Sequence, residues 1–234
     1  MNMKTLGILG GVGPQTTSKV YHSVIDYYRA NKRSTYPSII IYNLPFPFKV
    51  EQEAIVEGRN SHKMVPYLIE GAKILEKSGA TFGILPCNTL HKYIDEIRAS
   101  VSMPFLSILD EVIDTLKSSH VRKVAILATQ SSVNERLYDG LLDENKIEAV
   151  YPAKKDQRDL DEIIIRLING KERKADIKKI ERISSSLIKR GSQAILLACT
   201  DLQGIAYKIK SKIPFIDSTD LLIKASLREL LSKE

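Results

Sequence analysis

Two short stretches decide the fold: "FGILPCNTL" at Phe82–Leu90 and "AILLACTDL" at Ala194–Leu202. Each is an apolar run that ends in a cysteine, and two small polar residues follow at once. Cys87 and Cys199 are the only cysteines among the 234 residues. Placing both thiols at such similar junctions indicates that the chain repeats itself.

The repeat extends beyond the cysteines. Upstream, "LGILGG" from Leu6 corresponds to "VAILAT" from Val124. Similar segments that recur in the same order along a chain indicate duplicated supersecondary units, so the sequence predicts two similar halves. The matched pairs are Gly79 with Gly191, Leu85 with Leu197, Cys87 with Cys199, Leu90 with Leu202, Ile97 with Ile209 and, after two residues are removed, Pro104 with Pro214.

Eight short runs rich in Ile, Val and Leu predict the strands. Continuous apolar runs of this length are typical of strands buried on both faces of a parallel sheet. Amphipathic stretches separate most of them, and the stretch 65–79 ends in a glycine that stops a helix. Together with the repeat, this alternation predicts an α/β fold of two similar lobes, each a parallel sheet flanked by helices, related by a pseudo-twofold axis with a cleft between them. The runs begin at Thr5, Ser38, Thr81, Pro104, Lys123, Ile147, Ala194 and Pro214.

Composition argues against several classes of protein. The formal net charge is +7, but the basic residues are dispersed, and the densest cluster, from Lys171, interleaves acidic residues at helical spacing. That pattern favours a solvated helix face, so we expect no nucleic-acid partner. No run approaches the roughly 20 apolar residues that span a bilayer, and the N-terminus does not resemble a leader. We therefore expect a cytoplasmic protein with no membrane partner and reduced thiols. No metal site is expected, because the histidines share no ligand spacing with the cysteines.

Both cysteines fall where ligands collect in α/β sheets, at the carboxyl ends of strands. Asn88, Thr89, Thr200 and Asp201 are candidate caps for the helices expected next. A helix N-terminus attracts carboxylates and lowers the pKa of a nearby thiol. Two such thiols facing one carbon acid could remove a proton from one side and return it to the other. The alternative is that each cysteine is only a small buried apolar residue.

Two turns at the ends of other strands are candidate ligand contacts. In "GILGGVGPQTT", the third glycine of a dinucleotide fingerprint is replaced by Thr16, which weakens that interpretation. Gly11 therefore marks either a turn that needs positive φ or a place where the backbone approaches a ligand. The corresponding turn of the second half offers Thr129, Ser131 and Ser132, either as hydrogen-bond donors to a ligand or as a helix cap.

With "GILGGVGP", "PCNTLH" and "ACTDL" in this order, the sequence resembles the aspartate/glutamate racemase superfamily, and most of all its aspartate racemases. The resemblance covers nearly the whole chain. It implies a cofactor-independent amino-acid racemase of two α/β lobes that acts on aspartate or glutamate as a homodimer. It makes Cys87 and Cys199 the acid/base pair. Asn88, Thr89, Thr200 and Thr129 would then bind the substrate, together with Ser132, Lys49 and Gly11.

Several positions depart from the pattern of that superfamily. Asp201 stands where glutamate is usual, and Lys49, in "PFPFKVE", stands where arginine is common. Arginine clamps a carboxylate with two hydrogen bonds and lysine cannot, so the amino acid and its preferred enantiomer stay open. The alternatives are a related isomerase or decarboxylase of another dicarboxylate, and a binding protein that has lost turnover.

The same resemblance implies where the lobes divide. The first lobe would comprise residues 1–101 and a returning C-terminal segment, 214–234. The second would comprise residues 102–213. The two Pro-Phe strands would then be the crossings between lobes.

Overall fold

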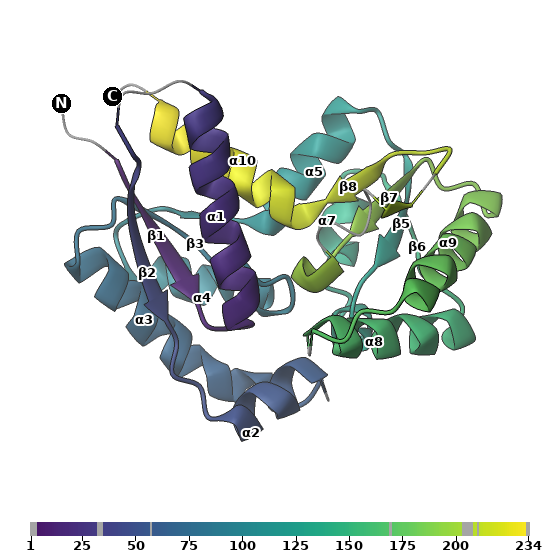
Figure 1. Ribbon diagram of the computed structural model, residues 1–234, viewed down its shortest axis with the longest axis horizontal. Coiled ribbons are helices and arrows are strands. Elements are labelled where there is room, and N and C mark those ends of the chain that lie inside the picture. The colour runs from purple at the N-terminus through teal and green to yellow at the C-terminus, as the bar shows by residue number, and fades with distance from the viewer. Residues whose placement is uncertain are drawn as a thin grey trace. The chain divides into compact units, whose positions relative to one another are not determined.

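The computed structural model describes residues 4–31, 35–56, 58–168, 170–202, 208–209 and 211–232. The chain divides into two compact units, and each contains a four-stranded sheet whose paired strands run parallel. Unit 1 comprises Met1–Ile108 and Thr219–Glu234, and unit 2 comprises Leu109–Ser218. The predicted α/β class, with two parallel sheets flanked by helices, is confirmed (Figure 1).

The sheet of unit 1 has the strand order β2-β1-β3-β4. Its strands are the four apolar runs predicted for this half, namely β1 (Thr5–Gly10), β2 (Ser38–Asn43), β3 (Phe82–Ile84) and β4 (Phe105–Leu106). The α-helices between them are α1 (Pro14–Ala30), α2 (Phe48–Glu51), α3 (Val65–Lys77) and α4 (Ile94–Ser100). Single turns of other helix types are η1 (Gln52–Val56), η2 (Ser61–Met64) and η3 (Thr89–Tyr93). As predicted, a glycine in the left-handed region, Gly79 at φ +94°, follows α3.

Unit 2 repeats this strand order as β6-β5-β7-β8. The strands are β5 (Lys123–Leu127), β6 (Glu148–Val150), β7 (Ala194–Leu197) and β8 (Phe215–Asp217). The helices are α5 (Ile108–Ser118), α6 (Gln130–Asn134), α7 (Asp139–Glu144), α8 (Lys154–Ile168), α9 (Lys174–Lys189) and the turn η4 (Thr200–Leu202), and α10 (Ser218–Leu231) follows β8. The basic run from Lys171 does form a helix, α9, which buries Ile180, Ile183 and Leu187.

The duplicated segments pair in the same register in both sheets. In unit 1, Leu6 pairs with Phe82, and in unit 2 the corresponding Val124 pairs with Ala194. The outer pairs agree as well, because Gly83 lies opposite Phe105 as Ile195 lies opposite Phe215. Register determines which side chains share a face of a sheet. Residues matched along the sequence therefore hold matched places within their own units.

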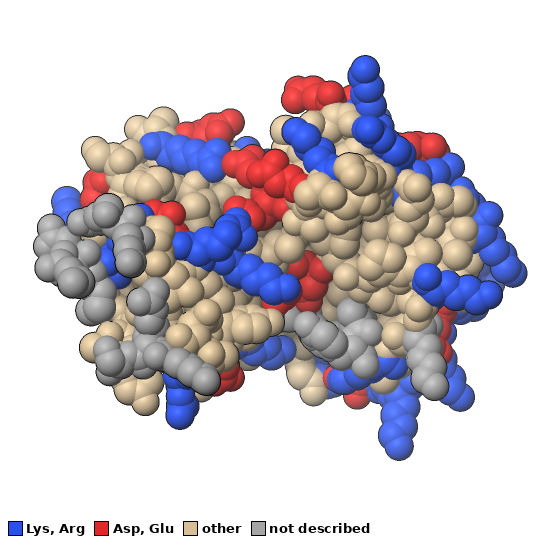
Figure 2. Space-filling view, turned by 90° about the horizontal axis from the view of Figure 1, so that it is seen from above, with Lys and Arg blue, Asp and Glu red and all other residues tan. Residues whose placement is uncertain are grey.

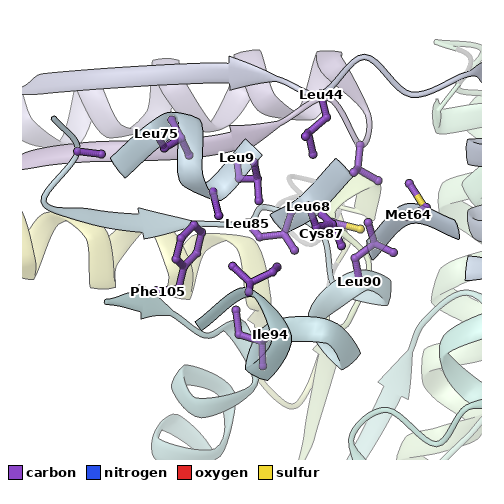
Figure 3. Packing of buried hydrophobic residues seen from close by; sticks show 14 of the residues in the cluster. Leu9, Leu44, Met64, Leu68, Leu75, Leu85, Cys87, Leu90, Ile94 and Phe105 are labelled. Atoms are coloured by element: carbon purple, nitrogen blue, oxygen red, sulfur yellow. The ribbon is translucent and has the colours of Figure 1, made fainter. Parts of the chain in front are cut away.

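Different helices cover the two faces of the unit 1 sheet. A Cβ added to Gly7 would meet Leu75 of α3, whereas one added to Gly10 would meet Thr17 of α1. Because side chains alternate along a strand, α3 and α1 lie on opposite faces. Helix α10 lies beside α1, and the Tyr27 hydroxyl donates to Asp220 at 2.8 Å. Figure 3 shows the core on the α3 face, which includes Cys87.

The unit boundaries fall on the far side of the Pro-Phe strands from where they were expected. The predicted divisions, 101/102 and 213/214, would have given β4 to the second lobe and β8 to the first. Instead β4 pairs with β3 inside unit 1, and β8 pairs with β7 inside unit 2. The chain leaves each sheet only after its fourth strand, at Ile108 and at Ser218. A buried strand end needs the backbone hydrogen bonds of its own sheet, which explains why each Pro-Phe strand stays with its unit.

Charged side chains are interspersed on the surface. On the face seen in Figure 2, Lys and Arg are scattered over both units and lie among Asp and Glu. Over the part of the chain that the structure describes, none of the helices is both long enough and apolar enough to cross a lipid bilayer.

Candidate active site

Cys87 lies just beyond the carboxyl end of β3. Its N–H donates to the Leu85 carbonyl at 2.8 Å, so the chain turns sharply as it leaves the sheet. The residue is 7% exposed, and its thiol is not part of a disulfide. Figure 3 shows the side chain among Met64, Leu68 and Leu90. The thiol is thus partly enclosed by core side chains at the edge where ligands collect in parallel sheets.

A buried histidine fastens the Cys87 loop. The His91 side chain is 0% exposed, and its Nδ1 lies 2.7 Å from the Cys87 carbonyl oxygen. The Ile108 backbone N–H donates to Nε2 at 3.0 Å. Since a backbone N–H can only donate and a carbonyl can only accept, Nδ1 must carry the ring proton. His91 is therefore held as a neutral Nδ1–H tautomer that connects the Cys87 loop to the residue after β4.

Cys199 occupies the corresponding position of unit 2, beyond the carboxyl end of β7. It too is 7% exposed and belongs to the core that α8 and α9 form with their face of the sheet. Its Sγ–H donates to Asp201 Oδ2 at 3.9 Å, a long contact between sulfur and a carboxylate. Because the carboxylate accepts, this contact requires the thiol proton to be present.

A chain of hydroxyl groups fastens the strand that carries Cys199. The Ser218 hydroxyl donates to the Leu197 carbonyl at 2.7 Å, and Tyr138 is hydrogen-bonded to Ser218. Ser218 has one hydroxyl proton and gives it to the carbonyl, so Tyr138 must donate to the Ser218 oxygen. Burial, together with the nearby Tyr151 and Cys199, raises the pKa of Tyr138 far above its usual range. The phenol therefore stays protonated and keeps donating.

The expected capping of the helices after the cysteines is not seen at Asn88. Cys87 is followed by the 3-10 turn η3 rather than by an α-helix, and Asn88 makes no side-chain capping bond to it. Cys199 is followed by the three-residue 3-10 turn η4. Such short turns sum few peptide dipoles, so the helix-dipole argument for a lowered thiol pKa loses its physical basis here. Asn88, Thr89 and Thr200 are buried beside the cysteines all the same.

The glycine turn after β1 has a structural cause. Gly11 has φ +98°, and an added Cβ would lie 2.6 Å from the Leu44 backbone nitrogen. Two N–H groups of this turn already have partners, because that of Gly11 donates to Thr17 Oγ1 and that of Gly13 donates to a Glu51 carboxylate oxygen. Neither of these two N–H groups is left unpaired for binding a phosphate.

The corresponding turn after β5 is a capped helix start. The Thr129 side chain accepts from the Ser132 N–H at 3.2 Å and donates to the Ser132 hydroxyl at 3.1 Å. Thr129 therefore caps the N-terminus of α6. Leu9 of β1 and Leu127 of β5 hold equivalent positions in the two units. Gly11 lies two residues after Leu9, and Thr129 lies two residues after Leu127.

The structure gathers the predicted residues at the carboxyl edge of each sheet. Unit 1 carries Lys49, exposed on α2 after β2, together with the residues around Cys87. Unit 2 carries those around Cys199 and the Thr129 turn. Within the described ranges, no group of three or more His, Cys, Asp or Glu side chains is placed to hold a metal ion.

Comparisons with known proteins agree with this architecture. The family model described as Asp/Glu/Hydantoin racemase matches residues 9–226. The chain belongs to that family. It is 32% identical to the broad-specificity amino-acid racemase RacX of Bacillus subtilis, over 97% of this chain and 98% of that protein.

Two solved structures share the fold over almost the whole length. The aspartate racemase homologue of Pyrococcus horikoshii has a TM-score of 0.81 at 26% identity, covering 98% of this chain and 100% of that one. The aspartate racemase of Picrophilus torridus has a TM-score of 0.77 at 29% identity, covering 97% and 94%. Family and relatives together support an amino-acid racemase, which is an isomerase.

Sequence reasoning missed the residues that fasten the two cysteine loops. A signal for His91 is present, because it follows Cys87 by four residues, the spacing at which a side chain reaches back one turn. Ser218 carried no local signal, since it lies nineteen positions after Cys199. The buried Tyr138 had none either.

Proposed function

We propose that this protein racemises a small amino acid, aspartate or a close relative, by proton transfer between Cys87, Cys199 and the α-carbon. The observation that carries the proposal is the equivalence of the two thiols. Each lies two residues beyond a matched leucine, Leu85 or Leu197, on the same face of its own sheet. A duplicated scaffold that keeps a thiol at this one position in both copies suits a reaction that needs two like acid/base groups.

The proposed chemistry assigns one thiolate and one thiol at the start of each turnover. The thiolate removes the α-proton and becomes a thiol, while the other thiol gives its proton to the opposite face of the same carbon and becomes a thiolate. Asp201 accepts from the Cys199 thiol, so we assign the resting proton to Cys199 and the thiolate to Cys87. In this state Cys87 removes the α-proton, which inverts one of the two enantiomers. The reverse direction uses the opposite assignment.

Substrate binding is assigned to the buried polar residues beside the thiols. Asn88, Thr89 and Thr200 offer amide and hydroxyl groups that would hold the α-carboxylate and stabilise the charge that develops as the α-proton leaves. Thr129, Ser132 and Gly11 would line the substrate. Lys49, as the one cation in this set, would attract a side-chain carboxylate. The proposal uses no cofactor.

The relatives motivate a panel of substrates rather than aspartate alone. One of them is named for broad specificity and another as an aspartate racemase. The protein should be incubated in deuterated water with single enantiomers of aspartate, glutamate and representative neutral and basic amino acids. Mass spectrometry and chiral chromatography would then report deuterium at the α-carbon and inversion.

Replacing either cysteine by serine is the deciding experiment. Serine keeps the shape of the side chain, but its hydroxyl is a far weaker acid than a thiol, so each of Cys87→Ser and Cys199→Ser should slow inversion by about 10²–10⁴-fold. Wild-type rates in both variants would overturn the thiol mechanism. Tight binding of an amino acid without isotope exchange would favour a protein that has lost turnover, and decarboxylation of a malonate would favour the other chemistry.

Two further properties are proposed on the resemblance to aspartate racemases. We expect a homodimer, to be measured by light scattering after size exclusion. We also expect the protein to work in the cytoplasm, because a reducing compartment keeps both thiols available.

A short bifunctional thiol reagent should join Cys87 to Cys199 within one chain, since the mechanism requires both sulfurs to reach one carbon atom.

A further inference from the structure

In each unit, one buried side chain ties the segment that carries the cysteine to the residue at which the chain leaves the sheet. The two units use different chemistry for this contact. In unit 1, the His91 ring joins the Cys87 carbonyl to the Ile108 N–H. In unit 2, the Ser218 hydroxyl bonds the Leu197 carbonyl, two residues before Cys199. The matched Pro-Phe strands make Ile108 and Ser218 equivalent positions, four residues after Pro104 and Pro214.

Ile108 and Ser218 share a second property. Each is the first residue of the helix that follows the fourth strand, and each is the last residue before the chain crosses to the other unit. The loop after the third strand in unit 1, and the last residue of the third strand in unit 2, are thus tied to the point where the chain leaves the sheet. All of these contacts are buried, and in a buried setting a lost hydrogen bond leaves an unpaired backbone group.

We propose that His91 and Ser218 are positioning residues, one for each thiol: His91 holds Cys87 and Ser218 holds Cys199. Neither side chain is assigned a proton-transfer step. Each acts through the backbone, by preventing the loop that carries its thiol from opening. The inference rests on the proposed function only in its kinetic consequences, because the fastening itself concerns the folded protein.

Burial explains why such fastening matters. Both cysteines are only 7% exposed, so a chemical reagent reaches either sulfur chiefly when its loop opens. Catalysis places a tighter demand on the same loops, because a misplacement of about 1 Å at a reacting group can cost about 100-fold in rate.

A crossed set of variants tests the proposal with each thiol as the control for the other. His91→Leu removes both ring bonds at similar side-chain size, and Ser218→Ala removes the bond to Leu197. Iodoacetamide is added to the folded proteins, and the alkylation rates of Cys87 and Cys199 are read separately by peptide mass spectrometry. Circular dichroism and thermal unfolding verify that each variant is folded.

We expect each substitution to change the alkylation rate of only one of the two cysteines. His91→Leu should speed alkylation of Cys87 by about tenfold, the effect of losing a buried hydrogen bond, and leave Cys199 unchanged. Ser218→Ala should do the reverse. In both variants kcat should fall by up to about 100-fold while KM changes little, because loop position affects the reacting atoms more than substrate binding. Equal effects on both thiols, or no effect on either, would overturn the assignment.

A milder substitution covers the case in which His91→Leu does not fold. Two asparagines of this chain, Asn31 and Asn145, donate from Nδ2 to the carbonyl four residues back, at 2.8 and 2.7 Å. His91→Asn should likewise keep the bond to the Cys87 carbonyl and lose only the one to Ile108. It should give an intermediate alkylation rate at Cys87, and a wild-type rate there would contradict the proposal.

The outcomes separate this inference from the proposed racemase activity. If the cysteine variants abolish racemisation but the crossed alkylation pattern is missing, the positioning roles fail and the function stands. If the pattern appears but no amino acid is racemised, the function fails and the positioning roles stand.

Discussion

Phe105 in unit 1 and Phe215 in unit 2 hold equivalent positions, yet Phe105 is 2% exposed and Phe215 is only partly buried. The cause lies one strand away. Phe105 pairs with Gly83, and its ring occupies the space that a side chain at Gly83 would need. Phe215 pairs instead with Ile195, which fills that space itself. The two sheets thus keep one register while they fill the same volume with different partners.

Polar contacts differ between the units as well. A histidine ring fastens the thiol loop of unit 1, and a serine hydroxyl supported by a tyrosine fastens the strand before the thiol in unit 2. Gly11 of unit 1 corresponds to Thr129 of unit 2, a turn with positive φ against a capped helix. The comparison teaches that backbone pairing is the shared property of the two units and that side-chain solutions are local.

The largest effect on stability is expected at Gly11. Gly11→Ala forces a Cβ onto a residue with φ +98° and against the Leu44 backbone. The backbone conformation alone costs about 1–3 kcal/mol, and displacement of Leu44 adds to it. The free energy of unfolding in urea measures the loss. Gly140→Ala is the matched control, since an added Cβ there meets nothing within 4 Å, and it should be neutral or stabilising.

A smaller loss of stability is expected at Gly83 of β3, the glycine that makes room for the Phe105 ring. In Gly83→Ala the new Cβ would lie 2.5 Å from the Phe105 ring, which must move within a packed core, so we expect a loss of about 1–3 kcal/mol. The double variant Gly83→Ala with Phe105→Leu should recover part of that loss in a double-mutant cycle. Strict additivity of the two changes would show that Gly83 does not make room for the ring.

The stability of unit 2 should decrease in acid because Asp176 of α9 loses the charge with which it binds Arg166 of α8. Burial alone would raise the pKa of Asp176, but hydrogen bonds from Arg166 and from the Arg173 N–H outweigh it, and the pKa is lowered. The ionised carboxylate therefore stabilises the fold above the unfolded pKa of about 4, and this stability is lost as the pH falls through the lower folded value.

Asp176→Asn tests that contribution. We expect a loss of about 1–2 kcal/mol at pH 7, because asparagine keeps only part of the hydrogen bonding to Arg166 and Arg173. The difference from the wild type should begin to shrink below about pH 4, where the unfolded carboxyl binds a proton, and should be smallest below the lowered pKa of the folded state, where the native carboxyl is neutral as well. Urea unfolding at both pH values measures it. A difference that stays constant with pH would contradict the role of the charge.

The smallest effect is expected at the unit 2 turn that corresponds to Gly11. Thr129→Ala removes the cap of α6 and should cost about 1 kcal/mol, whereas Thr129→Gly should cost only a few tenths. Thermal unfolding measures both losses, and their comparison with the loss for Gly11→Ala compares the two turns. A loss at Thr129→Gly as large as that of Gly11→Ala would mean that the two turns are under the same constraint.

Much of the backbone could be read from local pattern. Each of the eight apolar runs forms a strand, and the stretch 65–79 forms α3 with a left-handed glycine after it. Pairing Cys87 with Cys199 along the sequence predicted two similar halves, and the structure shows that the two sheets share one register. The boundaries were misplaced because hydropathy identifies a strand without saying which sheet will pair with it, as β4 and β8 show.

The sequence by itself determined the strands, the helices α3 and α9, the repeat and the paired thiols, because apolar runs, helical periodicity and matched segments are properties of the chain. Only the tertiary structure decided what surrounds those thiols. His91 meets the Ile108 N–H, and Ser218 meets the Leu197 carbonyl, across segments far apart in sequence. Such contacts depend on which backbone groups remain unpaired once the sheets have formed, and no local pattern records that.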